Sequence, residues 1–284
     1  MGTYRLSVLL GYIVGFQRKI MSLSLGGKTA LVTGVTGHIG KAVVKGLVEA
    51  ECYVIGTDRF PRYSVDDLFE ELQLTSGENM TYIACDLTLT EDIEKLFKAI
   101  DKERPDGVDI FINAAASFSF GSLIEDISLE QWKREVSINL TAAFMITQYI
   151  LHKMKKKGWG RIVYVSSQLG LKAIPKAAAY ITTKAGLCGL TRAVSVETAE
   201  NGITVNAVCP GPREGDMMDS VLNTHAAERK TSTREAREFV QTFLPTRRFS
   251  SSSQIASFIM YLCSSGADNM TGTSTSIDGG LNAT

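Results

Sequence analysis

The sequence lacks an excess of charge of either sign. Lys and Arg together number 30, and so do Asp and Glu, so the formal net charge is zero. Binding to nucleic acid or to an anionic membrane surface relies on a positive excess. The balance therefore gives no reason to expect nucleic acid or a membrane as a partner, and a small molecule becomes the expected ligand.

Cysteine and histidine are scarce as well. The cysteines are odd in number, widely spaced and mostly set in apolar segments, which is typical of buried thiols and not of a disulfide or zinc framework: Cys52, Cys85, Cys188, Cys209 and Cys263. The histidines His38, His152 and His225 are scattered, and none has a second ligand type at metal-site spacing. We therefore predict reduced thiols, a cytoplasmic protein and no catalytic metal.

A long apolar run is also missing. Near the N-terminus an apolar stretch, residues 6–16, precedes Arg18 and Lys19, but a membrane span needs about 20 apolar residues. No small-residue cleavage site follows to complete a secretory signal. We interpret residues 1–20 as a poorly ordered extension or an upstream start before Met21, with a membrane tether as the alternative.

What is present is an alternation of short β-branched runs with longer amphipathic stretches. Hydrophobic residues make up 44% of the chain and charged residues 21%, which fits a soluble globular protein with a sizeable core. The expected strands are residues 29–33, 52–57, 80–85, 108–113, 161–166, 203–208 and 274–277. The strongest helices are expected at residues 129–156 and 178–201. This pattern predicts one α/β domain over residues 21–284, a doubly wound parallel seven-stranded sheet with helices on both faces, the Rossmann fold.

One region interrupts this alternation. From Pro210 to Pro245 the chain carries Pro, Gly, Met and a charged run without a strand pattern. It follows the carboxyl end of a parallel strand, which is where ligands bind in open α/β sheets. We interpret residues 212–245 as a mobile helical substrate lid, and a solvated surface excursion is the alternative.

A glycine-rich turn, TGVTGHIG from Thr33 to Gly40, follows the first strand and opens a helix that should begin near His38. Glycines let the backbone approach a pyrophosphate, and the helix N-terminus supplies free N–H groups and a positive dipole. Asp58, at the end of the second strand, is placed to accept hydrogen bonds from the ribose hydroxyls and to repel a 2′-phosphate. NAD is thus favoured over NADP, although Arg59 could receive a phosphate.

Tyr180 and Lys184 are four residues apart in a helical segment, so their side chains share one face. A free phenol has a pKa of about 10, and an adjacent ammonium favours the phenolate. The pair is therefore a candidate general acid/base. Ser167 follows the strand at residues 161–166, where its hydroxyl could bond a substrate oxygen that develops negative charge; a capping serine is the alternative.

With these residues in place, the chain from about Leu25 onward resembles a short-chain dehydrogenase/reductase of the single-domain branch. The pieces that carry the resemblance are the glycine turn, Asp86 in CDLT, Asn113 in INAA, Asn139 in SINLTAAF, Ser167, Tyr180-x-x-x-Lys184, NAVCPG up to Gly211, and IDGG from Ile277. The resemblance implies a catalytic tetrad of Asn139, Ser167, Tyr180 and Lys184, in which Asn139 holds a relay water and Lys184 also binds the nicotinamide ribose. It implies that Asp86 contacts adenine and that residues 208–211 line the nicotinamide pocket. The cofactor-binding residues expected overall are Gly34, Thr36, Gly37, His38, Ile39, Gly40, Asp58, Arg59, Asp86, Leu87, Asn113, Ala114, Ala115, Tyr180, Lys184, Pro210 and Gly211.

Three positions depart from the family pattern. His38 stands where this branch has its second glycine, and the spacing of Gly37 partly compensates by resembling the turn of the family's longer members. Ala115 replaces a glycine and adds one methyl group near the cofactor. Gly215 replaces a threonine that commonly bonds the nicotinamide carboxamide, which removes one anchor.

Within the family, the lid and the C-terminal segment are similar to bacterial 3-hydroxybutyrate dehydrogenases, with some likeness to 3-oxoacyl carrier-protein reductases. The polar carboxylate-binding positions of the former correspond here to Ser117, Leu169, Ala177 and Val221, with Lys176 displaced by one. A buried carboxylate without donors costs several kcal/mol, so that substrate is not carried over. A mainly apolar pocket is expected instead, from Phe118, Phe120, Leu169, Ile174, Met217 and Met218, with Gln168 beside them; half of these residues could equally belong to the core.

The sequence thus predicts an NAD-dependent oxidoreductase that interconverts a medium-sized secondary alcohol and its ketone. The alternative is a catalytically weak or inactive NAD-binding regulatory protein, suggested by His38 and Gly215. The two long helices and the last strand are the surfaces through which members of the family pair. We therefore expect a homotetramer, with a homodimer second.

Overall fold

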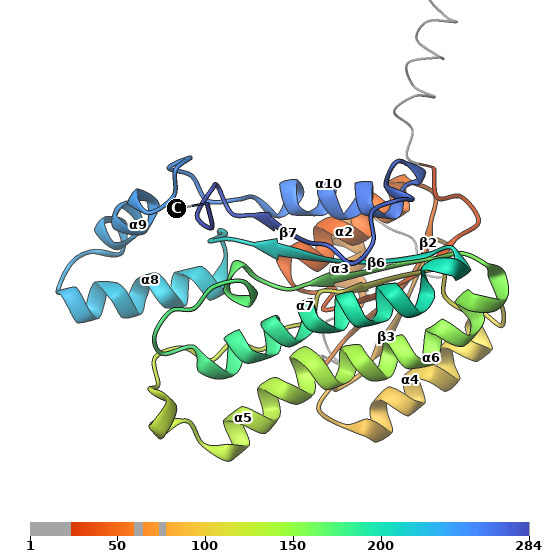
Figure 1. The fold of residues 1–284 in the computed structure, drawn as a ribbon, viewed down its shortest axis with the longest axis horizontal. Helices are drawn as coiled ribbons and strands as arrows, with labels where there is room; N and C mark the ends of the chain where they lie inside the picture. The colour runs from red at the N-terminus through yellow and green to blue at the C-terminus, as the bar shows by residue number, and fades with distance from the viewer. Residues whose placement is uncertain (1–23, 60–64, 74–77, 284) are drawn as a thin grey trace, which may run out of the picture.

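A computed structural model of the chain describes residues 24–59, 65–73 and 78–283. Seven parallel strands form one sheet in the order β3-β2-β1-β4-β5-β6-β7 (Figure 1). Their bounds are β1 Thr29–Thr33, β2 Tyr53–Asp58, β3 Met80–Ala84, β4 Ile110–Asn113, β5 Gly160–Val165, β6 Ile203–Pro210 and β7 Ser274–Ile277. The predicted Rossmann-type sheet is confirmed, whereas the predicted N-terminal extension lies outside the described residues.

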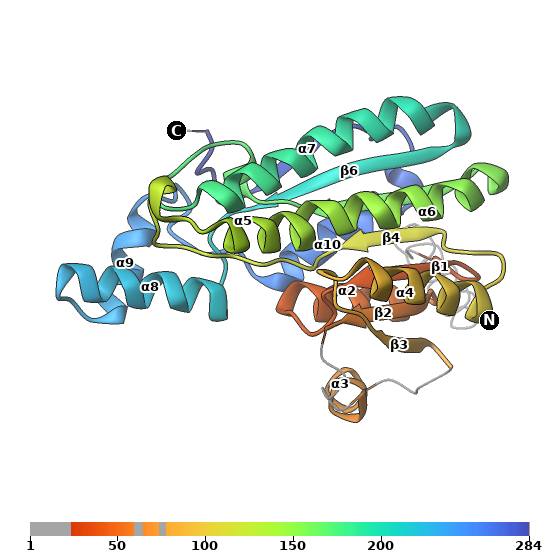
Figure 2. The ribbon, with the colours of Figure 1, turned by 90° about the horizontal axis from the view of Figure 1, so that it is seen from below.

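Helices cover both faces of the sheet because successive residues of its buried strands point to opposite sides. Val32 of β1 packs with α2 (His38–Glu49) and α10 (Ser252–Cys263), while Leu31 packs with the opposite layer. Figures 1 and 2 show α2 and α10 on one side and α4, α6 and α7 on the other. The bounds of the remaining main helices are α3 Val65–Leu72, α4 Thr90–Glu103, α6 Ala142–Lys157 and α7 Ala178–Thr198.

The long helix predicted at residues 129–156 is confirmed, and it contains a π-helical segment that was not predicted. The chain forms α5 (Leu129–Val136), a π-helical segment (Ser137–Thr141) and then α6. A π turn inserts one residue into the helical ladder and often marks a functional position. Here the segment carries Asn139, whose side chain is fully buried. The second predicted helix is likewise confirmed as α7, continued by a 3₁₀ turn at Ala199–Asn201.

The predicted lid is helical and projects beyond the carboxyl end of the sheet (Figures 1 and 2). It consists of α8 (Asp216–Arg229) and α9 (Thr233–Thr242). Helix α9 begins with a capping box, in which the Ser232 hydroxyl accepts from the Glu235 backbone N–H and the Glu235 carboxylate accepts from the Ser232 backbone N–H. Leu222, Ala226 and Ala236 form a small apolar core between the two helices. The lid is therefore a packed helical pair, and its motion stays a prediction.

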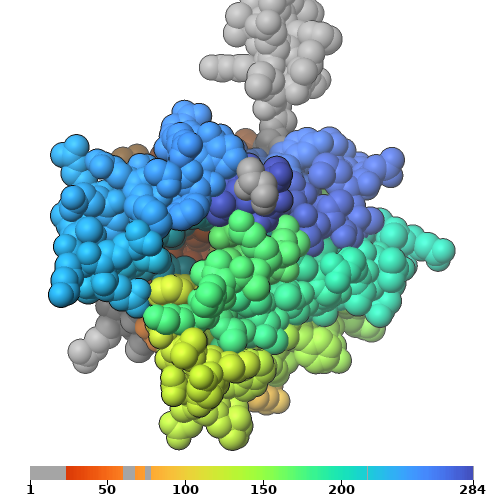
Figure 3. Space-filling view, turned by 60° about the vertical axis from the view of Figure 1, so that its left-hand side comes forward, coloured from red at the N-terminus to blue at the C-terminus, as the bar shows by residue number. Residues whose placement is uncertain are grey.

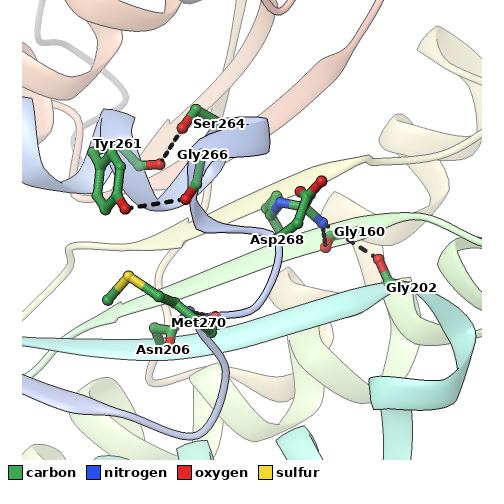
Figure 4. Close-up of polar contacts among 9 residues, drawn as sticks. Gly160, Gly202, Asn206, Tyr261, Ser264, Gly266, Asp268 and Met270 are labelled. Atoms are coloured by element: carbon green, nitrogen blue, oxygen red, sulfur yellow. Dashed lines mark hydrogen bonds and ion pairs between the residues drawn. The ribbon is translucent and has the colours of Figure 1, made fainter.

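The last strand is fixed to the sheet through the turn that precedes it. The Asn206 side chain on β6 donates to the carbonyl of Met270 at 2.6 Å and accepts from the Thr273 hydroxyl at 2.9 Å. At the end of α10, the Tyr261 hydroxyl donates to the carbonyl of Gly266 at 3.1 Å (Figure 4). The Asn206 bonds hold the turn that leads into β7 against β6.

All five cysteines are buried free thiols, as predicted. In the described part of the chain, none of the helices combines the length and apolar character needed to cross a bilayer.

Candidate active site

The carboxyl ends of the strands open into one cavity of about 870 Å³, bounded on its far side by the lid. In Figure 3 the surface is hollowed between the light-blue lid helices and the green segment that follows β5. The sheet order reverses between β1 and β4, and ligands of open α/β sheets bind at such a switch point. The cavity therefore lies where a dinucleotide is expected.

The glycine turn enters this cavity at the N-terminus of α2. Gly34 has φ +72°, and a Cβ placed on it would lie 2.6 Å from the backbone nitrogen of Ala115. A Cβ on Gly40 would overlap the carbonyl oxygen of Gly34. Gly37 is the N-cap of the helix, which begins at His38 as predicted. The turn is thus as close to its neighbours as the backbone allows, and the space above it stays open for phosphate groups.

Asp58 ends β2 beside the turn, and its carboxylate is held in a fixed orientation. Oδ2 accepts from the Thr36 hydroxyl at 2.6 Å and from the Thr36 backbone N–H at 3.2 Å. Oδ1 accepts from the backbone N–H of Arg59 at 2.7 Å. Oδ1 has a further lone pair, so the carboxylate can still accept a ribose hydroxyl from the cavity side.

The predicted adenine end lies next to it, where Asp86 and Leu87 line the cavity after β3. Asp86 Oδ1 accepts two bonds from Thr88, from the backbone N–H at 2.9 Å and the hydroxyl at 2.7 Å. Asn113 was expected to bind the cofactor, but its side chain is completely buried beneath the wall. It accepts from the Thr33 hydroxyl at 3.1 Å, so it joins β4 to β1 under the glycine turn.

Ser167, Tyr180 and Lys184 converge on one wall of the cavity. Ser167 follows β5, where its hydroxyl accepts from the Leu169 backbone N–H at 3.1 Å, and it lies close enough to Tyr180 to act on the pKa of that phenol. It therefore caps a turn and faces Tyr180 at once, while its bond to a substrate oxygen stays a prediction. On α7, Lys184 donates to the carbonyl of Val165 at 2.8 Å.

Asn139 lies behind this wall. Its amide oxygen accepts from the Ser117 backbone N–H at 2.7 Å, and its amide nitrogen donates to the Ser117 carbonyl at 2.8 Å and to the Thr183 hydroxyl at 3.0 Å. The side chain thus ties the loop after β4 to α7, one residue before Lys184. The amide is engaged on both atoms, and the predicted relay water at Asn139 stays a prediction.

Burial sets the pKa values of Tyr180 and Lys184. The sequence suggested that Lys184 would favour the Tyr180 phenolate, whereas in the ligand-free structure burial favours the neutral phenol. It raises the pKa of Tyr180 to about 12, while the Ser167 hydrogen bond and the Arg213 charge act to lower it. Burial also lowers the pKa of Lys184 to about 8. The free site therefore holds a neutral phenol beside a lysine that is mainly protonated at neutral pH.

A buried carboxyl near this pair was missed from the sequence. Glu135 of α5 is fully buried; its Oε1 accepts from the Ser119 backbone N–H at 2.9 Å, and Oε2 has no partner among the described residues. Burial raises the pKa of Glu135, and the Lys184 charge lowers it. The spacing of Glu135 could have indicated its place near the site, because a residue four positions before Asn139 lies on the same helix face.

The expected substrate residues line the remaining part of the cavity, including the six apolar side chains named above. Phe118 packs edge-on against the Tyr180 ring with 4.7 Å between ring centres, and it stacks on Phe120. Gln168 also lines it, as do four basic side chains missed from the sequence, which are Arg134, Lys172, Arg213 and His225. The wall is thus apolar with basic groups between.

Comparison with known proteins identifies the class. A family model described as enoyl-(acyl carrier protein) reductase matches residues 34–282. The chain is 34% identical over 257 residues to a D-beta-hydroxybutyrate dehydrogenase of Rhizobium meliloti, covering 90% of this chain and 99% of the relative. It is 34% identical over 261 residues to the 3-oxoacyl-acyl-carrier-protein reductase FabG of Aquifex aeolicus, covering 92% and 100%. A solved actinorhodin polyketide ketoreductase with NADPH matches with TM-score 0.84 and 32% identity over 90% of this chain and 98% of that one.

The fold, the nucleotide cavity and these matches define an NAD(P)-dependent oxidoreductase that acts on CH–OH groups. The chain belongs to the short-chain dehydrogenase/reductase family.

Proposed function

We propose that the protein interconverts a secondary alcohol and its ketone with NAD(H), using Tyr180 as the general acid/base. The observation that carries the proposal is the convergence of Ser167, Tyr180 and Lys184 on a single cavity wall opposite the glycine turn. A substrate oxygen placed against that wall can meet two hydroxyl groups at once, which is the arrangement that proton exchange with a carbonyl or alcohol requires.

The residues present fit a dinucleotide. The turn from Gly34 to Gly40 lines the cavity at the N-terminus of α2, which suits the pyrophosphate, and Asp58 suits the adenosine ribose. Pro210 and Gly211 line the opposite end, next to Tyr180 and Lys184. When bound, the nicotinamide supplies or accepts the hydride.

In the oxidation direction Tyr180 takes the alcohol proton as a phenolate, and in reduction it gives that proton to the carbonyl oxygen. Ser167 donates a hydrogen bond to the same oxygen and so favours the charge that develops there. Lys184 is held by Val165, and its positive charge offsets the cost of burying a phenolate. Asn139 positions this helix by its bonds to Ser117 and Thr183.

We propose NAD as the preferred cofactor, because the fixed Asp58 carboxylate would repel a 2′-phosphate at the ribose. The solved ketoreductase with NADPH and the adjacent Arg59 argue for NADP, so the comparison of the two cofactors is the first step of the test.

We propose a substrate with a medium-sized apolar body that packs on Phe118, Leu169 and Met217. Lys172 and Arg134 line the same cavity, and their positive charges could pair with an acidic group on that substrate. The carboxylate donors expected of a hydroxybutyrate enzyme are replaced at Leu169 and Val221, so the name of that relative does not transfer to this chain.

We also propose a homotetramer, with a homodimer second. A shallow apolar depression of about 400 Å³ lies on α6 and α7, the helices expected to pair. It is lined by Leu140, Phe144 and Leu190 among others, and Phe144 is 48% exposed. Burying such a face against a second copy removes apolar area from water.

The test is a titration of the purified protein with NADH and NADPH by nicotinamide fluorescence, followed by a panel of secondary alcohols and ketones with the preferred cofactor. Tighter NADH binding and turnover on the panel support the proposal. NADH binding without any turnover across a broad panel would favour a regulatory NAD-binding protein, and failure to bind either nucleotide would overturn the cofactor site.

A further inference from the structure

Two positions that depart from the family pattern, His38 and Gly215, meet at one point of the cavity. Gly215 precedes α8 with φ +128°, a conformation that residues with a side chain rarely adopt. A Cβ placed on it would lie 3.0 Å from Arg213 Nη1, 3.1 Å from His38 Cε1 and 3.2 Å from His38 Nδ1. A threonine here would therefore push both side chains away, so the glycine is what admits them.

The backbone fixes the position of Arg213. It pairs with Ser250 in an isolated parallel bridge, and the Ser250 N–H donates to the carbonyl of Pro212 at 3.1 Å. The guanidinium donates from Nη1 to the Ser252 hydroxyl at 3.3 Å and to the carbonyl of Glu214. These bonds hold the base of the lid and aim the charged group at the cavity, which Arg213 lines.

His38 reaches the same point from the other side. It is the first residue of α2 and directly follows the N-cap Gly37, so its ring stands at the positive end of the helix dipole. Both side chains line the cavity together with Gly34, Gly37 and Gly40. The neighbouring acid, Glu214, turns its carboxylate to Arg237 at 3.1 Å. A guanidinium, an imidazole and a helix N-terminus thus face one space.

We propose that Arg213 and His38 form a clamp over the cofactor's pyrophosphate, with Arg213 on the lid side and His38 on the α2 side. This inference rests on the proposed cofactor site and adds to it. Sequence reasoning took Gly215 as the loss of one anchor, whereas the clamp replaces a neutral hydroxyl by charge-assisted hydrogen bonds, which are stronger. Because Arg213 begins the lid, the clamp also links cofactor binding to the lid's position.

The experiment measures ligand affinity, not turnover. ADP-ribose carries the pyrophosphate without nicotinamide, and adenosine carries neither. Calorimetric titration of the full chain compares the parent with Arg213→Gln and His38→Gln. Arg213→Gln is expected to weaken ADP-ribose binding on the order of tenfold or more, as loss of a charge-assisted bond does. It should leave adenosine affinity unchanged and reduce the salt dependence of ADP-ribose binding. His38→Gln is expected to weaken ADP-ribose by a few-fold.

The matched control is Glu214→Gln, an adjacent charge change on a residue whose carboxylate points to Arg237. It should not alter either affinity. Thermal melting checks the fold of each variant, and should Arg213→Gln fail to fold, Arg213→Lys replaces it, keeping the charge and losing the planar fork. Wild-type ADP-ribose affinity in the folded arginine variant would overturn the clamp alone. Equal loss of adenosine affinity would also overturn it, and no ADP-ribose binding by the parent would overturn the cofactor site itself.

Discussion

The ammonium of Lys184 lies 5.5 Å from the centre of the Tyr180 ring, and both side chains are buried on the same face of α7. Burial shifts the pKa values of the two groups in opposite directions, because it disfavours the charged form of each. It raises the pKa of Tyr180 to about 12 and lowers the pKa of Lys184 to about 8. Burying the two side chains therefore lowers the stability of the fold, while it places two proton-exchanging groups side by side in the site. Both effects can be measured.

Replacing Lys184 should remove activity and raise stability at neutral pH. The folded pKa of Lys184, about 8, lies below its ordinary value of 10.5, so the fold disfavours the ammonium. Between these two pH values the unfolded chain binds more protons than the folded one, and stability rises with pH. Ligand-free Lys184→Met should thus melt at a higher temperature than the parent at pH 7. The difference should narrow as the pH approaches 10, and a variant less stable at pH 7 would contradict the burial argument.

Glu135→Gln should become more stable than the parent as the pH rises. Burial raises the pKa of Glu135, and a carboxyl with a raised folded pKa stabilises the fold while protonated and loses that contribution at higher pH. Gln can still accept from the Ser119 N–H but cannot ionise. Denaturant unfolding of both proteins at several pH values above about 4, the unfolded value for Glu, measures the difference. A constant difference across this range would show that Glu135 does not titrate there.

Neutralising Asp58 should shift the cofactor preference toward NADP. Asp58→Asn keeps a side-chain oxygen for the Thr36 hydroxyl and removes the charge that repels a 2′-phosphate. NADPH affinity should rise on the order of tenfold and NADH affinity should fall by a few-fold. Asp86→Asn, a second acid on the cavity wall, serves as the control and should affect both nucleotides alike. An unchanged ratio of NADPH to NADH affinity in Asp58→Asn would show that this carboxylate does not determine the cofactor preference.

The sheet could be predicted from the sequence because each buried strand is a short apolar run with a turn at its end. Even Ser274–Ile277, the least apolar strand, was placed correctly. The π-helical segment at Asn139 could not be predicted, because it depends on bonds to Ser117 and Thr183, which are distant in sequence. Propensity alone favours one long helix through this segment.

The site residues were found where a motif places them, and missed where chemistry depends on packing. Arg213 was not singled out, since the sequence does not show that Gly215 leaves space for it. Asn113 was expected at the cofactor because the motif lies beside it, yet its side chain points under the turn to Thr33. Both differences arise from tertiary contacts that local patterns do not encode.

Introducing a charge on the outer face of α6 should reduce the assembly size. Phe144→Lys places an ammonium in the apolar depression beside Leu140 and Leu190, where burial against a second copy would be costly. Leu89→Lys is the control, because Leu89 is 47% exposed, close to the 48% of Phe144, and precedes α4 instead. Light scattering after size exclusion should give a tetramer for the parent and the control and a smaller species for Phe144→Lys. A parent that is monomeric would rule out the proposed assembly.

The central claim, that Tyr180 moves the proton, is tested most directly by comparing Tyr180→Phe with the parent on a substrate found in the alcohol and ketone panel. Removing only the hydroxyl should lower kcat/KM by about 100-fold or more, the usual contribution of a general acid/base, while NADH affinity by fluorescence stays close to that of the parent. Full turnover by Tyr180→Phe would contradict the assignment and require another group on the cavity wall to exchange the proton.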